Sequence, residues 1–115
     1  MQNSINIQLV AEPLEFSMSQ RASFRIGFKA KNVGSQAIDP NLYAASLLVE
    51  GKPNLAWNLA IQNGPRDEAW RNLEPGETVS ASWPLGEAMF PDPGEYEIVL
   101  RSGAQESPVH VRVVP

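Results

Sequence analysis

Hydrophobic and polar residues alternate along five short segments of the chain, with a period of two. The segments are INIQL (5–9), FRIGFKA (24–30), VSASW (79–83), YEIVL (96–100) and VHVRV (109–113). A period of two places every second side chain on the same face of a β-strand, so that one face is buried and the other meets solvent. The pattern therefore predicts that strands with one apolar face are the main elements of the fold.

Proline and glycine punctuate the chain between these strands. EPGE (74–77) and DPGE (92–95) place proline and glycine at the two central positions of a type II turn. SGAQ (102–105) predicts a short loop that joins the last two strands into an antiparallel hairpin.

The middle of the chain is less regular. A further strand is predicted at 46–50, whereas 55–64 fits either a short helix or a strand, and 64–72 fits a loop or a single helical turn. No repeat or linker divides the sequence. We therefore expect one domain, 1–115, with an all-β fold: an antiparallel sandwich of seven to eight strands.

One motif gives this sandwich a more specific character. Asp92-Pro93-Gly94-Glu95-Tyr96, with Ile98 two places beyond, resembles the tyrosine corner of the immunoglobulin-like and fibronectin type III-like superfamily. The resemblance implies that the Tyr96 hydroxyl bonds to backbone a few residues upstream. It also implies that Ile98 and an apolar residue near Ile26 or Phe28 replace the inter-sheet disulfide.

A second resemblance involves the tryptophans. Trp70, the segment LEPGE (73–77), a strand that carries Trp83, and PGEYEIVL together resemble the layout of the bacterial intracellular proteinase inhibitor family. This family resemblance implies inhibition of a serine protease, although no reactive-site motif can be transferred residue by residue.

Composition and charge narrow the possible partners. The formal charge is −4, opposite in sign to the surplus that nucleic-acid-binding domains use against phosphates, so no nucleic acid partner is expected. No apolar run is long enough to predict membrane insertion. The chain has no cysteine, which favours a cytoplasmic protein, with a secreted bacterial domain as the alternative.

The residues needed for catalysis or metal binding are sparse. His110 is the sole histidine and is expected on the outer face of the last strand, while the carboxylates are scattered. Because a nucleophile needs a neighbouring base and a metal needs several ligands, we expect no enzyme activity, no metal site and no cofactor. Glu95 and Glu97 are expected to face Arg101, His110 or Arg112 across the sheet.

A basic strip is predicted on the second strand. Arg21, Arg25, Lys29 and Lys31 share the outer face in this pattern. Lysines guard strand edges in many sheets, so a solvated face is one interpretation. The other is a docking strip for an acidic partner.

The candidate binding site is the segment 51–76. It is rich in aromatic and hydrogen-bonding side chains, namely Trp57, Asn58, Gln62, Asn63, Arg66 and Trp70. Exposed tryptophan and arginine dominate many protein interfaces. The sequence therefore predicts a non-enzymatic protein-interaction module that binds through this segment or a sheet edge, with homo-oligomerisation as one form of binding. The alternatives are a protease inhibitor, a carbohydrate-binding module with exposed tryptophans, and a structural role for the tryptophans. In the last, Trp57 is the core tryptophan on the third strand, Trp70 closes the end of the barrel, and Trp83 belongs to the core.

Overall fold

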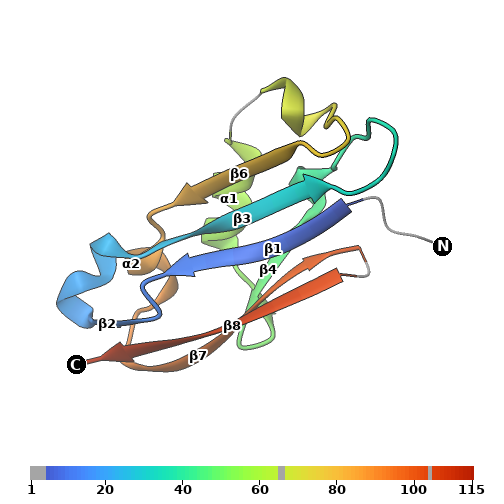
Figure 1. Cartoon of the computed structure of the whole chain (residues 1–115). Helices are drawn as coiled ribbons and strands as arrows, with labels where there is room; N and C mark the ends of the chain where they lie inside the picture. The colour runs from blue at the N-terminus through green and yellow to red at the C-terminus, as the bar shows by residue number, and fades with distance from the viewer. Residues whose placement is uncertain (1–4, 65–66, 104) are drawn as a thin grey trace.

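Two β-sheets make up the framework of the domain in the computed structural model, which describes residues 5–64, 67–103 and 105–115 (Figure 1). The first sheet is antiparallel and has the order β1 (Ile5–Glu12), β3 (Arg25–Asn32), β6 (Thr78–Trp83). The second has the order β2 (Glu15–Ser17), β8 (Gln105–Val114), β7 (Gly94–Ser102), β4 (Ser46–Val49), β5 (Lys52–Pro53). Its neighbours are antiparallel except for β2, which runs parallel to β8. The result is a small β-rich domain with two sheets, compatible with the predicted sandwich.

Short helices connect the strands. Three are 3₁₀ helices, η1 (Met18–Ser23), η2 (Leu42–Ala44) and η3 (Glu68–Trp70), and two are α-helical, α1 (Leu55–Gln62) and α2 (Gly86–Met89). All five alternating segments of the sequence lie in strands apart from Phe24, which directly precedes β3, and β7 and β8 form the predicted hairpin. The ambiguous segment 55–64 contains the helix α1, and 64–72 contains the single turn η3.

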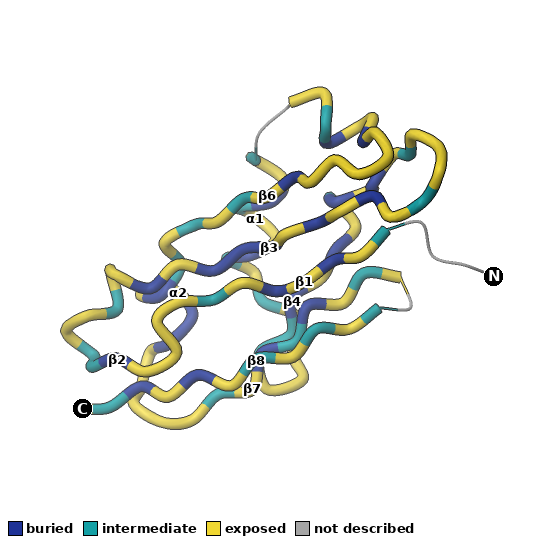
Figure 2. The backbone as a smooth tube through the Cα atoms, in the orientation of Figure 1, coloured by how far each residue is buried: buried dark blue, intermediate teal, exposed yellow. Residues whose placement is uncertain are grey.

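The core lies between the sheets and follows the predicted alternation, which Figure 2 shows as buried and exposed positions in turn along β1 and β3. At one end, Phe16, Phe24, Phe90 and Tyr96 form a cluster in which neighbouring ring centroids lie 4.9–5.6 Å apart. A second group of rings contains Phe28, Tyr43, Trp57, Trp70 and Trp83. Edge-to-face and tilted contacts of this kind add to the free energy gained by burying the rings.

Tyr96 joins the first aromatic cluster to the main chain. Its hydroxyl donates a hydrogen bond to the carbonyl oxygen of Asp92 at 2.6 Å, four residues upstream as the sequence predicted. Its ring packs against Phe90 with centroids 4.9 Å apart. Ile98 on β7 and Ile26 on β3 are both fully buried and belong to opposite sheets. Apolar side chains therefore occupy the inter-sheet space at this point.

Two details of the prediction are wrong. Gly76 has the φ of +80° that a type II turn requires, and Glu77 N–H donates to the Glu74 carbonyl at 2.9 Å. Gly94, however, has a φ of +150°, so the turn at 92–95 is not of this type.

Arg21 lies in η1 and not on β3. Its guanidinium donates to the carbonyls of Met18 and Phe90, both at 3.0 Å. It ties η1 to the end of α2 and does not extend the basic strip.

The free edge of β1 is closed by side chains of β8. Gln105 Oε1 accepts from the Ile7 N–H at 3.2 Å, and Ser107 Oγ accepts from the Leu9 N–H at 3.0 Å. Gln105 Nε2 also donates to the Ile5 carbonyl. These bonds satisfy backbone groups that an edge strand would otherwise leave to solvent or to another chain.

Asn32 joins the C-terminal end of β3 to the start of β6, which lies beside it. It is the one fully buried polar side chain among the described residues. Its Nδ2 donates to the carbonyls of Gln36 and Leu73, both at 2.8 Å, and its Oδ1 accepts from Gly34 N–H at 2.8 Å. Its backbone pairs with Glu77 and Gly76 at 3.0 and 2.9 Å. One amide thus fixes two loops that come from distant parts of the chain.

Replacing Asn32 with alanine should lower the free energy of unfolding by at least about 2 kcal/mol, because several partly or fully buried backbone groups lose their partners. The measurement is urea unfolding at constant m-value. Asn6→Ala, on the exposed face of β1, should change stability by less than about 0.5 kcal/mol. Equal effects of the two substitutions would contradict the role assigned to Asn32.

Tyr96→Phe should cost about 0.5–1.5 kcal/mol, because it removes the hydrogen bond to Asp92 and keeps the ring on Phe90. Tyr96→Ala should cost more, since the ring contact is lost as well. Both values come from the same urea titration. A Tyr96→Phe variant as stable as the wild type would show that water replaces the Asp92 carbonyl without loss.

Candidate functional site

The helix α1 forms the middle of the predicted binding segment. It begins after Asn54, whose side-chain oxygen accepts from the Trp57 N–H at 2.9 Å, an N-cap that satisfies a donor of the first turn. The segment that precedes it is the two-residue edge strand β5, anchored where Asn54 N–H donates to the Leu47 carbonyl at 2.9 Å. The cap and the strand together fix which faces of α1 point inward and outward.

Trp57 and Trp70 are buried, so the expectation that they form exposed binding anchors is wrong. Trp57 is 0% exposed; its ring packs edge-on against Trp83 at 5.5 Å, and its Nε1 donates to the Ala45 carbonyl at 3.3 Å. Trp70 is 1% exposed and packs against Phe28 at 5.4 Å. Both rings fill space between the first sheet and the segment before β4, so they are core residues, but Trp57 lies on the helix α1 and not on the predicted third strand. Trp83, expected in the core, is only partly buried.

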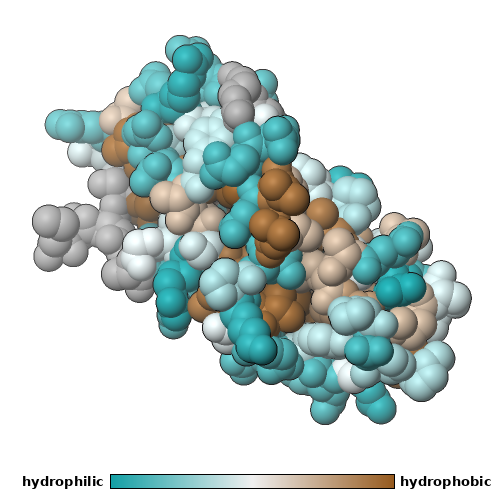
Figure 3. Space-filling view, turned by 180° about the vertical axis from the view of Figure 1, so that it is seen from behind, coloured by the Kyte–Doolittle hydropathy of each residue, from teal (hydrophilic) through white to brown (hydrophobic). Residues whose placement is uncertain are grey.

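The same helix presents two leucines to solvent. Leu55 and Leu59 are 69% and 56% exposed. Each lies two residues from Trp57, which is about 200° around a helix of 3.6 residues per turn, so burying Trp57 forces both leucines outward. Figure 3, which views the molecule from behind, shows a strip of hydrophobic surface where α1 lies. Sequence reasoning missed these leucines, although their spacing from Trp57 gave the signal.

Three of the predicted polar residues stay close to this surface. Asn58, Gln62 and Asn63 are exposed, on α1 or directly after it. Gln62 Nε2 lies 3.5 Å from the Tyr43 carbonyl, and Asn63 Nδ2 donates to the Leu59 carbonyl at 2.9 Å. Arg66 lies outside the described residues. The helix therefore combines two exposed leucines with neighbouring amides.

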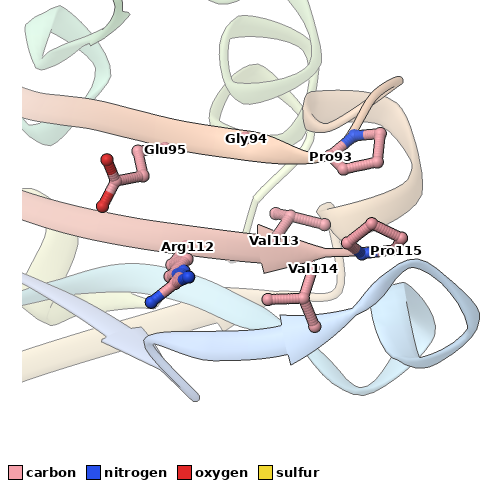
Figure 4. Close-up of a pocket in the computed structure, with 7 residues that line it drawn as sticks. All are labelled: Pro93, Gly94, Glu95, Arg112, Val113, Val114 and Pro115. Atoms are coloured by element: carbon pink, nitrogen blue, oxygen red, sulfur yellow. The ribbon is translucent and has the colours of Figure 1, made fainter.

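A separate hollow of about 420 Å³ lies at the ends of β7 and β8 (Figure 4). Pro93 and Pro115 lie at the strand ends, with Glu95 and Arg112 further along. Glu95 Oε1 lies 3.9 Å from His110 Nε2, and Arg112 Nη1 lies 3.8 Å from Glu15 Oε1. These charged groups already have partners across the sheet, as exposed pairs of small energetic effect.

The described part of the chain contains no cluster of three or more histidine, cysteine or carboxylate side chains that could hold a metal ion. His110 is exposed on the outer face of β8, as the sequence predicted. Within the same residues, no helix is long and apolar enough to cross a membrane.

No protein-family model matches the chain, and no curated protein matches it either.

Fluorescence quenching should distinguish the three tryptophans. We expect at most one accessible tryptophan in the wild type, and in Trp83→Phe the fraction quenched by succinimide, a bulky neutral quencher, should fall close to zero because Trp57 and Trp70 are buried. A fraction that survives Trp83→Phe would place one of the other two at the surface. In that case the carbohydrate-binding alternative, which needs an exposed ring, would regain its anchor.

Proposed function

We propose that this chain is a non-enzymatic protein-interaction module of immunoglobulin-like fold, which binds a protein partner through the segment 51–76. Three features support the fold assignment. The first is the strand order of the two sheets. The second is that the chain passes from β1 in the first sheet to β2 in the second, where β2 runs parallel to β8, and the third is the Tyr96 hydrogen bond to Asp92.

The exposed leucine pair on α1 carries the functional proposal. Single exposed apolar residues are normal on protein surfaces. Here, however, Leu55 and Leu59 lie one turn apart on one face of a helix whose opposite face is anchored by Trp57 and Ile61. The helix is short and capped, so the leucines occupy fixed positions and a partner would lose little entropy in binding them.

The amides of Asn58, Gln62 and Asn63 supply the polar part of the same surface. Interfaces pair an apolar centre with a rim of hydrogen-bonding groups, and the leucines and amides of α1 have this arrangement. Trp57 and Trp70 support the site from beneath, by holding α1 in place, rather than by touching the partner.

The test is a double substitution, Leu55→Glu with Leu59→Glu. Because both side chains are exposed, the free energy of unfolding should change by less than about 0.5 kcal/mol per substitution. In affinity capture with quantitative mass spectrometry, a partner that the wild type enriches should be lost by at least tenfold with the variant. The matched control, Leu14→Glu with Val33→Glu, changes two other exposed apolar residues and should retain the partner.

A partner that both variants retain would place binding elsewhere on the molecule. Light scattering on the purified chain tests whether the partner is a second copy of this chain. Dimerisation that disappears only in the Leu55→Glu, Leu59→Glu variant would identify a second copy as the partner.

A further inference from the structure

The outer face of the three-stranded sheet is basic, although the whole chain is acidic with a formal charge of −4. Its exposed charged side chains are three cations, Arg25, Lys29 and Lys31, and one carboxylate, Glu12. Among the described residues, the three ion pairs all lie on the other sheet. Lys29 and Lys31 face amides and hydroxyls of β1 and β6 in the strand register, whereas Arg25 lies opposite Glu12.

This face is also hollowed. A depression of about 640 Å³ is lined by Val10, Lys29, Ser80 and Trp83, among others. Gly27 lies between Val10 and Ser82 in the strand register and is itself buried. A Cβ on Gly27 would collide with the Ala81 carbonyl, so glycine is required there. Val10 is 43% exposed beside it.

The sheet has one open edge, and this edge borders the hollow. Among the described residues, β6 is the last strand of its sheet and pairs only with β3, so the backbone groups of alternate residues point away from the sheet. The sequence of β6, TVSASW, has no charge or proline to block pairing. The edge of β1, by contrast, is closed by Gln105 and Ser107.

Arg25 closes the far end of this edge, at Ser82. Its Nη2 donates to the Ser82 carbonyl at 2.8 Å and its Nε to Ser82 Oγ at 3.1 Å. The guanidinium therefore lies across β6 with its charge on the outer face. Lys29 and Lys31, which face Ser80 and Thr78 in the register, continue the positive charge along the strand.

We propose that β6 accepts an extended acidic segment of a partner protein as an added fourth strand. The inference rests on the proposed interaction function and names the chemistry of a partner at the sheet edge. Backbone hydrogen bonds to β6 hold the segment, and every second side chain is a carboxylate on the face shared with Lys29 and Lys31. The alternate side chains are apolar and lie beside the exposed part of Trp83.

A second copy of this chain is a poorer occupant. Two β6 edges paired to each other would place the cations of both β3 strands on one continuous face or on opposite faces of the same joined sheet. Neither arrangement supplies carboxylates to Lys29 and Lys31, whereas an acidic strand does.

The experiment uses a fluorescein-labelled ten-residue peptide of alternating glutamate and valine, with binding followed by anisotropy. We expect saturable binding to the wild type and at least a tenfold weaker affinity for Lys29→Glu with Lys31→Glu. Lys52→Glu with Arg71→Glu makes the same change in net charge at two exposed residues outside this sheet. That control should stay within about twofold of the wild type after correction for ionic strength.

Backbone pairing is tested separately. Two peptides, N-methylated at every glutamate or at every valine, cannot donate hydrogen bonds from those positions, and at least one should bind tenfold more weakly. Leu55→Glu with Leu59→Glu should bind the unmodified peptide normally, so failure of the α1 proposal and failure of this one are distinguishable.

Three outcomes would overturn the proposal: no saturable binding at millimolar peptide, equal losses in the two charge-reversal variants, or no effect of either N-methylation. The last would mean that the face only attracts negative charge, and heparin would then compete as well as the peptide. Dimerisation of the chain alone that protects the β6 amides from hydrogen exchange would assign the edge to a second copy and also refute the proposal.

Discussion

The unequal width of the two sheets is the constraint on which the rest of the structure depends. Three strands cannot cover the inner face of five, so the domain needs other material to exclude water from its core. On the β6 side this material is the segment between β5 and β6, which supplies Trp57 and Trp70. The two rings reach from the first sheet, at Trp83 and Phe28, to the chain just before β4. Two tryptophans thus take the place of missing strands.

This packing solution explains where the apolar surface of the domain lies. A helix that buries Trp57 and Ile61 on one side must turn Leu55 and Leu59 away from the core. Replacing a strand by a helix also leaves β6 without a second neighbouring strand in the part of the chain that the structure describes. The exposed leucines and the open sheet edge are therefore two consequences of the same event, the use of α1 in place of another strand.

Strands were predictable from the sequence because their signal is local. Alternation over five to seven residues predicted β1, β3, β6, β7 and β8 with their inward faces, but not the short strands β2 and β5, and proline with glycine predicted the turn at Gly76. The same alternation, continued one step past Ala30, would have placed Asn32 inside, yet a buried amide is recognisable only with its distant partners at Leu73 and Gln36. Arg21 was misplaced for the same reason: its hydrogen bond to Phe90 spans 69 positions of the chain.

The binding segment was harder, since its apolar residues leave no clear face. Leu55, Ala56, Trp57, Leu59, Ala60 and Ile61 surround most of α1. Periodicity alone cannot choose between the tryptophan face and the leucine face of such a helix. The choice is made by the space beside β6, which only a large ring fills, and by the Ala45 carbonyl that accepts the Trp57 N–H. The tertiary setting therefore decides which residues remain for function.

Three of the four sheet edges, those of β1, β5 and β6, show how selectively this domain exposes backbone. The edge of β1 is closed by polar side chains of β8, and β5 is a two-residue strand that carries lysine and proline, both of which discourage pairing. β6 has six residues, carries no lysine or proline, and is bonded by a side chain at the Ser82 carbonyl, through Arg25. The nearest charges are the cations of β3, which repel basic strands and attract acidic ones. An edge beside a mainly basic face discriminates between partners by their side chains while it binds them through their backbone. This combination distinguishes a specific docking edge from an aggregation-prone one.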